Sequence, residues 1–378
     1  MKRSAWAAPL IALLALLFGF NADLNAAVDD FCDNLGCASI SKFSANIDSQ
    51  LQGKVVGYVS IVGGKTVEYG TARTNVDPPS RKMSTEVPIN VASVSKVLTT
   101  IAVLQSLARH HLTIESKIAS FLPPDWIQGP NVGTITFHQL LTHSAGFRGG
   151  DTGYEGLRQQ IQAGVQLADK KKAVYNNLNF AIFRVLLPYM EGFSDPGPAT
   201  RPEATANFYI SYMQMHVFRP VGVTNADCKP GPNSNPALYY RFPPGETHGV
   251  EAGDWTLICG GGGWVLTASD LIKIVQSLIH DNTLLTKAQK KQMDQDCLGW
   301  DCSVMSQSDY RGKNGGLFYG NGIVEQTFIG IFKGKLGVVL LINSQPPGSI
   351  TGVVVKAFSA AAYSFHEARP VPGPQIIR

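Results

Sequence analysis

The chain has 378 residues, a formal net charge of +4, 44% hydrophobic residues and 16% charged residues. This length allows one large domain or two ordinary ones with a sizeable core, and the composition excludes a disordered chain. The one dense basic run, Lys170 to Lys172, is expected on a solvated loop. Because a nucleic-acid groove needs more basic residues interleaved with aromatic ones, no nucleic-acid partner is expected.

The N-terminal stretch has the pattern of a secretory signal peptide. Lys2 and Arg3 precede an apolar run from Ala5 to Phe20, and the small residues Ala26 and Ala27 follow. The run is short for a spanning helix, although an uncleaved anchor is the alternative. We therefore expect a signal peptide over residues 1–27, a secreted or periplasmic mature chain, and no stable membrane insertion after cleavage.

Six cysteines form the even set Cys32, Cys37, Cys228, Cys259, Cys297 and Cys302. In an oxidising compartment an even number favours disulfides, and six cysteines allow fifteen pairings. Two pairs, Cys32–Cys37 and Cys297–Cys302, are five residues apart and could close local loops, which leaves Cys228 with Cys259. Zinc sites usually need C-x-x-C or H-E-x-x-H spacings, which are absent, so neither a metal nor another cofactor is expected.

The segments before residue 115 predict a hairpin and a long helix. "KVVGYVSIVGGKTVEYG" (54–70) alternates on both sides of Gly63-Gly64, which is typical of two strands joined by a tight turn. From Ser93 to Leu112 apolar residues recur at intervals of three and four, which predicts a largely buried helix.

Residues 116–255 are rich in proline, glycine and short amphipathic segments. "ITFHQLLTHSAGF" (135–147) predicts a helix ended by Gly146. "NNLNFAIFRVLLPYM" (176–190) predicts a helix capped by Asn176 or Asn177 and closed at Pro188. Further on, "CGGGGWVLTASDLIKIVQSLI" (259–279) predicts a turn, a short strand, and a helix that begins with a capping box.

The C-terminal third returns to strands. "GIVEQTFIGIFKGKLGVVLLINS" (322–344) predicts two strands joined at residues 333–335, and "GSITGVVVKAFSAAAYSF" (348–365) predicts a final helix. The expected fold class is therefore α+β: an antiparallel sheet flanked by helices, with a helical subdomain inserted. We expect a single catalytic domain over 28–378, with an α/β part at 28–115 and 256–378 and a helical part at 116–255.

The spacing Ser-x-x-Lys occurs at Ser93 with Lys96 and again at Ser39 with Lys42. A serine nucleophile needs a base and donors for an oxyanion. At the start of the buried helix, Lys96 lies one turn beyond Ser93 on the same face, where burial would keep its amine neutral. Ser39 is instead expected to cap a short surface helix. The G-x-S-x-G of α/β-hydrolases is absent.

Two further clusters follow Ser93 in order, Tyr175-Asn176-Asn177 and Lys313-Asn314-Gly315. With the segments "LLTHSAGF" (140–147) and "GGGWVLTASDL" (261–271), they make the chain resemble the serine β-lactamase and penicillin-binding DD-peptidase family. The resemblance spans roughly residues 45 to 365. It is strongest to the branch that holds class C β-lactamases, DD-carboxypeptidases, D-amino-acid-specific peptidases and β-lactamase-like esterases.

The resemblance implies roles for individual residues. Ser93 would attack the acyl carbon, Lys96 and Tyr175 would share its proton, and Asn177 would orient the substrate. The backbone N–H groups of Ser93 and Gly316 would form the oxyanion hole.

Three further expectations concern the surroundings of these residues. A phenolate at Tyr175 needs its pKa to fall by about three units, and two nearby cations, Lys96 and Lys313, could supply much of that shift. Gly315 would let a substrate lie close to an edge strand. His143 is expected to be a structural histidine, not a catalytic base.

The chain departs from the family at Asn314, where lactamases carry threonine. A threonine hydroxyl and a lysine together recognise a substrate carboxylate, so the change puts efficient β-lactam hydrolysis in doubt. The expected function is an exported serine acyl hydrolase that acts through a Ser93 acyl-enzyme on a small ester or D-amino-acid amide. The alternatives are a class C-like β-lactamase or DD-carboxypeptidase and, in another class, a penicillin-sensing or non-catalytic binding protein. The partner would be a small-molecule or peptide substrate, and the sequence does not indicate the oligomeric state.

Overall fold

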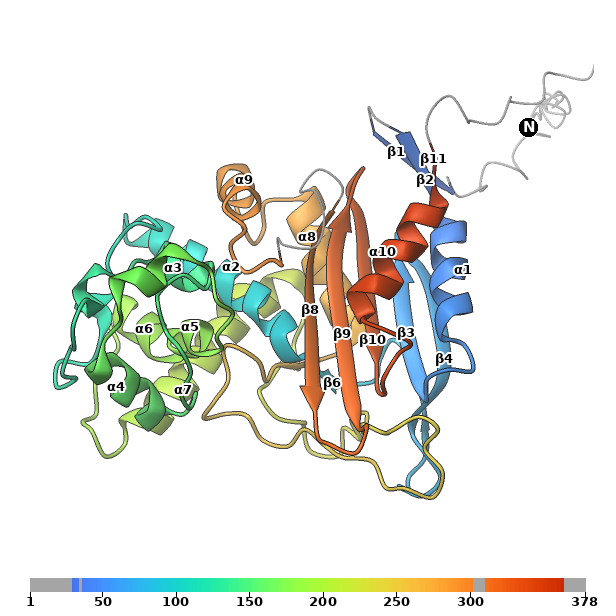
Figure 1. Cartoon of the computed structure of the whole chain (residues 1–378), viewed down its shortest axis with the longest axis horizontal. Helices are drawn as coiled ribbons and strands as arrows, with labels where there is room; N and C mark the ends of the chain where they lie inside the picture. The colour runs from blue at the N-terminus through green and yellow to red at the C-terminus, as the bar shows by residue number, and fades with distance from the viewer. Residues whose placement is uncertain (1–28, 34–35, 302–309, 364–378) are drawn as a thin grey trace, which may run out of the picture.

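A computed structural model of the chain describes residues 29–33, 36–301 and 310–363. The expected signal peptide and Cys302 lie outside these residues. Figure 1 shows two parts: a sheet with helices on both faces, and a group of short helices beside it. Within the described residues, no helix is both long and apolar enough to cross a membrane.

The larger part is built on a six-stranded antiparallel sheet. In spatial order its strands are β5 (Arg81–Lys82), β4 (Lys65–Arg73), β3 (Gly57–Val62), β10 (Leu336–Ile342), β9 (Val324–Phe332) and β8 (Tyr310–Phe318). The two predicted hairpins are confirmed as β3–β4 and β9–β10. Both tight turns contain glycines with positive φ, at Gly63, Gly64 and Gly334, a conformation that glycine adopts without strain.

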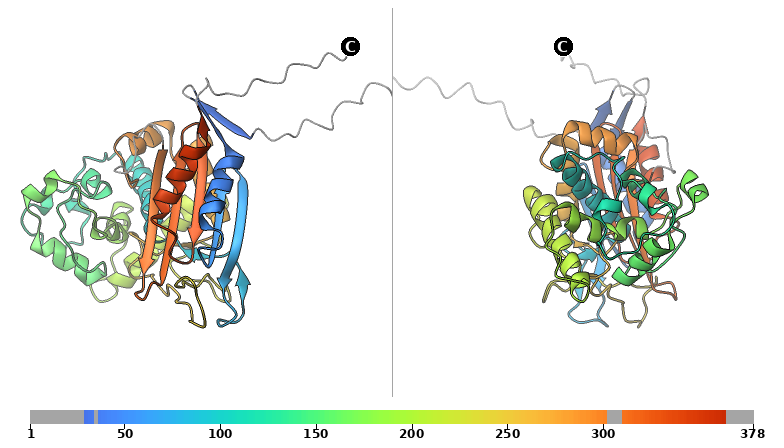
Figure 2. Two further views of the ribbon diagram at one scale, coloured as in Figure 1. Left: turned by 45° about the vertical axis from the view of Figure 1, so that its right-hand side comes forward. Right: turned by 90° about the vertical axis from the view of Figure 1, so that its left-hand side faces the viewer.

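Helices cover both faces of this sheet, which confirms the predicted α+β class. Helices α1 (Ile40–Leu51) and α10 (Ile350–Ala361) pack together on one face, and α8 (Ala268–His280) lies on the other (Figures 1 and 2). Along β10, Val338 and Leu340 belong to the core under α1 and α10, whereas Val339 and Leu341 belong to the core on the α8 side. Because side chains alternate between faces, a central strand buried on both sides is apolar throughout.

The smaller part consists of short helices around α2. They are α2 (Ser95–Arg109), α3 (Phe137–Leu141), α4 (Tyr154–Ala163), α5 (Leu178–Ala181), α6 (Phe183–Met190) and α7 (Arg201–Met213). Fifteen residues long and buried along most of its length, α2 lies between this group and the sheet (Figure 1). A 3₁₀ turn, Ala92–Val94, leads into it, which agrees with the predicted helix start near Ser93.

Two predicted helix ends in this part are wrong. The helix expected to run to Gly146 ends at Leu141, because His143 adopts φ +57°, a left-handed conformation through which an α-helix does not continue. The helix expected to close at Pro188 runs to Met190 with Pro188 inside it. Burial of the surrounding apolar residues outweighs the one backbone hydrogen bond that proline removes so near the helix end.

The remaining elements are small. They are β1 (Asp30–Asp33), β2 (Gly36–Ser39), β11 (Ala362–Tyr363), β6 (Ile89–Asn90), β7 (Val265–Leu266) and α9 (Lys287–Gln295). The predicted capping box at the start of α8 is present between Thr267 and Asp270.

Two predicted disulfides are confirmed. Cys32–Cys37 closes the β1–β2 hairpin, and Cys228–Cys259 joins two loops 31 residues apart in sequence. The expected bond of Cys297 falls on Cys302, outside the described residues, and stays a prediction.

Candidate active site

Ser93 lies where the chain leaves the β6–β7 pair and enters α2. The Asn90 side-chain oxygen accepts a hydrogen bond from the Ala92 N–H at 2.9 Å, and the Val91 N–H donates to the Trp264 carbonyl at 2.7 Å. Ala92 has φ +45°, in the left-handed region that non-glycine residues rarely adopt. Such strain persists only where the surroundings enforce it, and here it immediately precedes the candidate nucleophile.

The structure brings Ser93, Lys96, Tyr175 and Asn177 together. Ser93 Oγ lies 2.6 Å from the Tyr175 hydroxyl and 3.1 Å from Lys96 Nζ. Lys96 Nζ also lies 2.8 Å from Asn177 Oδ1 and donates to the Gly261 carbonyl. Tyr175 and Asn177 follow Ser93 by 82 and 84 positions in the sequence, yet they form one hydrogen-bonded cluster with Ser93 and Lys96.

The environment of Lys96 favours a neutral amine. The residue is fully buried, and burial, with the nearby Lys313 as a smaller cause, lowers the pKa of Lys96 well below its usual value, against the opposing charge of Asp301. A neutral amine has two N–H groups and one lone pair. Since the Asn177 and Gly261 oxygens can accept only hydrogens, the lone pair is left for the Ser93 hydroxyl, the arrangement a general base requires.

Tyr175 departs from the expectation of a phenolate. The residue is 51% exposed, but its hydroxyl lies within hydrogen-bond distance of Ser93 Oγ. Burial raises the pKa of Tyr175 to about 12, helped by the Asp301 charge and opposed by the Ser93 hydrogen bond. The expected lowering of this pKa is thus wrong in direction, because one neighbouring cation is driven neutral and the other, Lys313, is paired with a carboxylate. Tyr175 keeps its proton at neutral pH.

His143 supports the segment that carries Tyr175. Its ring lies 4.5 Å from the Tyr175 ring, centroid to centroid, and its Nδ1 lies 3.2 Å from the Asn176 N–H, which donates to it. Burial, the largest cause, lowers the pKa of His143 to about 3. A neutral imidazole held by the backbone favours the structural role over that of a catalytic base.

Lys313 faces the site but is not free. Its Nζ lies 5.0 Å from the centroid of the Tyr175 ring, and it forms an ion pair with Asp301. The lysine side chain is 3% exposed and that of Asp301 is 23% exposed. Asp301 is the main residue that sequence reasoning missed, and no motif or spacing pointed to it.

Asn314 points to the opposite face of the sheet. Its Nδ2 donates to Thr351 Oγ1 on α10 at 3.1 Å, as expected for the residue after Lys313 in a strand. The amide that replaces the family threonine is therefore engaged away from Ser93.

Gly315 and Gly316 of β8 lie beside Ser93. A Cβ on Gly315 would lie 2.4 Å from Thr327 Oγ1 and 2.9 Å from the Ser93 backbone nitrogen, so only glycine allows this approach. Gly316 lines the pocket together with Ser93. This placement suits the predicted oxyanion hole.

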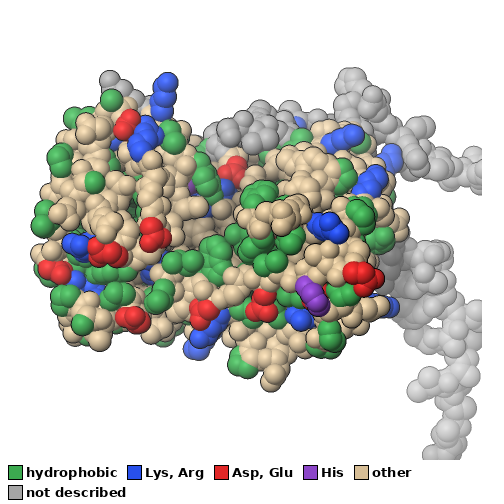
Figure 3. Space-filling view, turned by 60° about the horizontal axis from the view of Figure 1, so that its bottom comes forward, with side chains coloured by type: hydrophobic (Ala, Val, Ile, Leu, Met, Phe, Trp, Pro, Cys, Tyr) green, Lys and Arg blue, Asp and Glu red, His purple; other side chains and the backbone are tan. Residues whose placement is uncertain are grey.

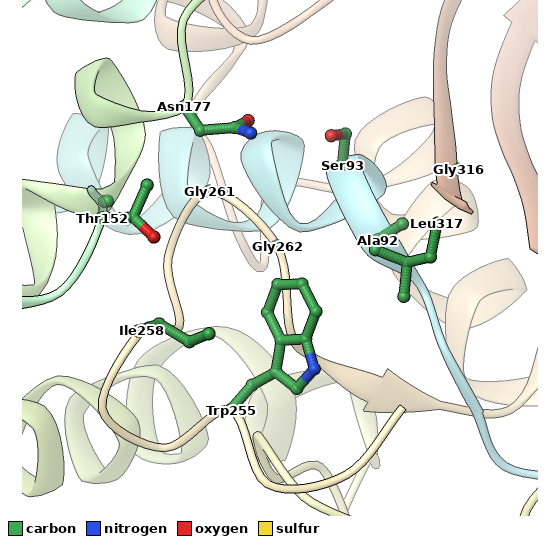
Figure 4. Close-up of a pocket in the computed structure, with 11 residues that line it drawn as sticks. Ala92, Ser93, Thr152, Asn177, Trp255, Ile258, Gly261, Gly262, Gly316 and Leu317 are labelled. Carbon is green, nitrogen blue, oxygen red and sulfur yellow. The ribbon is translucent and has the colours of Figure 1, made fainter. Parts of the chain in front are cut away.

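A small open pocket of about 80 Å³ lies in front of Ser93 (Figure 4). Its lining, taken from five segments of the chain, carries no charged side chain among the described residues: Ala92, Ser93, Thr152, Asn177, Ala181, Trp255, Ile258, Gly261, Gly262, Gly316 and Leu317. Figure 4 shows the Trp255 indole between Ile258 on one side and Ala92 with Leu317 on the other.

Two exposed apolar side chains adjoin the lining residues in sequence. Leu257 and Phe318, next in sequence to the lining residues Ile258 and Leu317, are 46% and 71% exposed. Figure 3 shows hydrophobic side chains grouped in the middle of the face that is lowest in Figure 1. The sequence analysis picked out the segment 261–271 but not Trp255, Ile258 or Leu317, because loop residues that line a pocket share no periodicity.

The fold and the Ser-Lys-Tyr cluster define a serine hydrolase of the β-lactamase type. The family model described as Beta-lactamase matches residues 43–353, and the chain belongs to this family.

Two curated relatives illustrate the range of the family. The chain is 24% identical over 208 residues to a putative penicillin-binding protein, PbpX, of Bacillus subtilis, a match that covers 53% of this chain and about half (49%) of that protein. It is 25% identical over 299 residues to lovastatin esterase of Penicillium rubens, covering 68% of this chain and 72% of the esterase.

Solved structures share the fold. A β-lactamase/D-alanine carboxypeptidase from Pseudomonas syringae superimposes with a TM-score of 0.63 at 15% identity, over 88% of this chain and 98% of that one. A D-stereospecific amidohydrolase from Streptomyces gives a TM-score of 0.60 at 15% identity, over 85% and 98% of the two chains.

Proposed function

We propose that the chain is an exported serine acyl hydrolase that acts through a Ser93 acyl-enzyme, with a small ester as its first substrate class and a D-amino-acid amide as the second. The observation that carries this proposal is the neutral, buried Lys96, whose lone pair is directed to Ser93 Oγ, with the protonated Tyr175 on the other side of the same oxygen.

Acylation follows from these protonation states. Ser93 Oγ bonds to the acyl carbon while its proton passes to Lys96 Nζ. The Tyr175 hydroxyl donates its proton to the departing alcohol oxygen as the acyl–oxygen bond breaks, and the proton on Lys96 then restores the phenol. In deacylation a water molecule loses a proton to the same base, releases the carboxylic acid and regenerates the Ser93 hydroxyl.

The oxyanion would be held at the edge of β8. In an extended strand, the N–H groups of every second residue point to the same side. The Asn314 N–H points off the free edge, where it meets Asp301, so the Gly316 N–H points off the same edge, next to the pocket. With the Ser93 N–H it supplies the two donors that a tetrahedral intermediate needs.

The uncharged apolar pocket supports an ester over an anionic substrate. The similarity to a lovastatin esterase points the same way, and the structural likeness to a D-stereospecific amidohydrolase keeps an amide open. A β-lactamase or DD-carboxypeptidase is the second candidate. The structural likeness to the Pseudomonas syringae β-lactamase/D-alanine carboxypeptidase and to a class C β-lactamase from Rhodobacter sphaeroides favours it. A non-catalytic binding protein has less support, since the hydrogen-bonded cluster around Ser93 is complete.

Export and domain organisation belong to the same proposal. The two disulfides support folding in an oxidising compartment, which fits a secreted or periplasmic enzyme. The proposed organisation is a single catalytic domain over 28–378, with its helical part at 116–255. The site then lies where α2 contacts both parts of this domain.

Steady-state hydrolysis of p-nitrophenyl butyrate, benzylpenicillin and a D-Ala-D-Ala peptide tests this proposal. Turnover of the ester well above that of the two anionic substrates is expected, with all turnover lost in Ser93→Ala. Turnover of none of the three substrates, with no covalent adduct, would contradict it. Preferred turnover of penicillin would favour the second candidate.

A further inference from the structure

Asp301 binds the free edge of β8 immediately before the pocket. Its backbone N–H donates to the Gly312 carbonyl at 2.9 Å, and its Oδ2 accepts from the Asn314 N–H at 3.0 Å. These two backbone groups lie on the same edge of β8 as the Gly316 N–H, separated from it by the Asn314 carbonyl. One residue therefore occupies the positions with which an extended substrate would pair as a further strand.

The other carboxylate oxygen of Asp301 binds Lys313. Oδ1 accepts from Lys313 Nζ, which lies 5.0 Å from the centroid of the Tyr175 ring. The lysine side chain is 3% exposed, so its charge is balanced by a carboxylate in a poorly solvated place. A substrate carboxylate would have to displace Asp301 from Lys313 and would then be repelled by it.

Asn314 offers no replacement, because its side-chain amide is engaged with Thr351 on α10. The pocket itself has no charged lining residue among those described. From these contacts we infer that Asp301 is a specificity-determining residue: it blocks both the β8 edge and Lys313, and so reserves the site for acyl substrates without a carboxylate near the scissile bond. This inference rests on the proposed acyl-hydrolase function.

Two esters that share one acyl group isolate the effect. The enzyme is assayed with 3-carbamoylphenyl butyrate, which is neutral, and 3-carboxyphenyl butyrate, which is anionic; the same butyryl-enzyme forms from both. The wild type is expected to favour the neutral ester in kcat/KM. Asp301→Asn frees Lys313 and should raise the ratio of anionic to neutral kcat/KM about 10- to 100-fold, the range that a charge-assisted hydrogen bond supplies.

Two controls define the cause. Asp294 pairs at 2.9 Å with Arg311, which lies on β8 like Lys313, and Asp294 does not line the pocket. Asp294→Asn therefore removes a carboxylate elsewhere and should leave the ratio of anionic to neutral kcat/KM unchanged. The double variant Asp301→Asn/Lys313→Gln should lose the gain seen in Asp301→Asn. If Asp301→Asn does not fold, Asp301→Ser takes its place, and the wild-type ratio is a test that needs no variant.

The outcomes separate the inference from the function on which it rests. Equal use of the two esters by the wild type, or an unchanged ratio in the Asp301 variant, overturns the inference while acyl hydrolysis stands. A gain of equal size in Asp294→Asn overturns it too, because the effect would then be one of net charge. Hydrolysis of neither ester by the wild type overturns the proposed function itself.

Discussion

The chain carries the spacing Ser-x-x-Lys at the start of two helices, α1 and α2. At α1, Ser39 Oγ accepts a hydrogen bond from the Lys42 backbone N–H at 3.2 Å and donates to Asp29 Oδ2 at 2.7 Å, while the Lys42 side chain is exposed. The serine is a helix cap, as predicted, and its lysine is a solvated cation.

At α2 the same spacing has a different result. The Lys96 side chain is fully buried, and its Nζ lies within hydrogen-bond distance of Asn177 Oδ1, the Gly261 carbonyl and Ser93 Oγ. The difference lies in the surroundings: α1 lies on the outer face of the sheet, whereas α2 is enclosed by the helical part and the glycine-rich turn at 260–263. Desolvation, not spacing, makes a lysine a base.

Replacement of each serine by alanine, one at a time, is the strongest test of this contrast. Ser93→Ala should lower kcat by about 10⁴- to 10⁶-fold, as loss of a nucleophile does. Ser39→Ala should keep near wild-type kcat and lose only about 1 kcal/mol of unfolding free energy, the contribution of a helix cap. Ester hydrolysis and urea unfolding of both variants provide the two numbers. Equal activity losses would remove the distinction.

Replacement of Lys96 and of Lys42 should affect activity as differently as replacement of the two serines. Lys96→Met removes the base and should reduce kcat/KM by about 10²- to 10⁴-fold. Lys42→Met, the matched control, should leave it unchanged, because the Lys42 side chain is exposed. A Lys96→Met enzyme that keeps its activity would show that another group takes the serine proton.

The pH profile reports the charge of Lys96. Activity needs the neutral amine, so kcat/KM for a neutral ester should rise with pH through the lowered pKa of Lys96 and then level off. For an ordinary lysine the rise would continue to about pH 10. A plateau reached well below that pH is expected, and a rise that continues to pH 10 would contradict a desolvated Lys96.

The two disulfides extend the comparison to stability. Cys228–Cys259 closes a 31-residue separation next to Gly260 and Gly261, and Cys32–Cys37 closes one of five residues beside Ser39. Loop entropy predicts losses of about 4 and about 2 kcal/mol when each pair is replaced by alanine. Only loss of the first pair should also lower kcat, since the Gly261 carbonyl accepts from Lys96. Unfolding and hydrolysis of both double variants test this, and a kcat loss confined to the Cys32–Cys37 variant would contradict it.

Glu325 provides a prediction that concerns stability alone. It lies on β9, fully buried, and neither carboxylate oxygen has a hydrogen-bond partner that meets geometric criteria among the described residues. Burial raises the pKa of Glu325 well above its usual value, against a smaller opposing effect of Tyr239. The unfolded chain therefore releases this proton near pH 4.5 while the folded chain keeps it, so stability falls as pH rises above that value.

Glu325→Gln should remove this pH dependence. It should raise the unfolding free energy at pH 7.5 and change it little at pH 4, where the glutamate is protonated in both states. Urea unfolding at the two pH values measures the difference. An equal effect at both would show that packing, not protonation, governs this position.

Sequence patterns predicted most of the sheet because its hairpins and alternating or fully apolar strands are local signals. They also brought Ser93, Lys96, Tyr175 and Asn177 to one place through the family resemblance. The helix ends at Leu141 and Met190 were not predictable, because capping and burial decided them.

The charge state of the site was beyond sequence reasoning. The expected phenolate at Tyr175 assumed two uncompensated cations. It failed because burial raises the pKa of Tyr175, and because Asp301 pairs with Lys313, a contact that no motif indicated. Electrostatic shifts depend on such three-dimensional neighbours, which a linear pattern does not contain.

The most direct test of the account is the site of acylation. The protein is mixed with p-nitrophenyl butyrate, quenched in acid within milliseconds to seconds, digested and mapped by mass spectrometry. We expect a butyryl group of about 70 Da, the mass of C₄H₆O, on the peptide that contains Ser93 and none on the peptide that contains Ser39. A label on Ser39, or turnover in the wild type that persists in Ser93→Ala, would contradict the claim that burial of Lys96 selects Ser93 as the nucleophile.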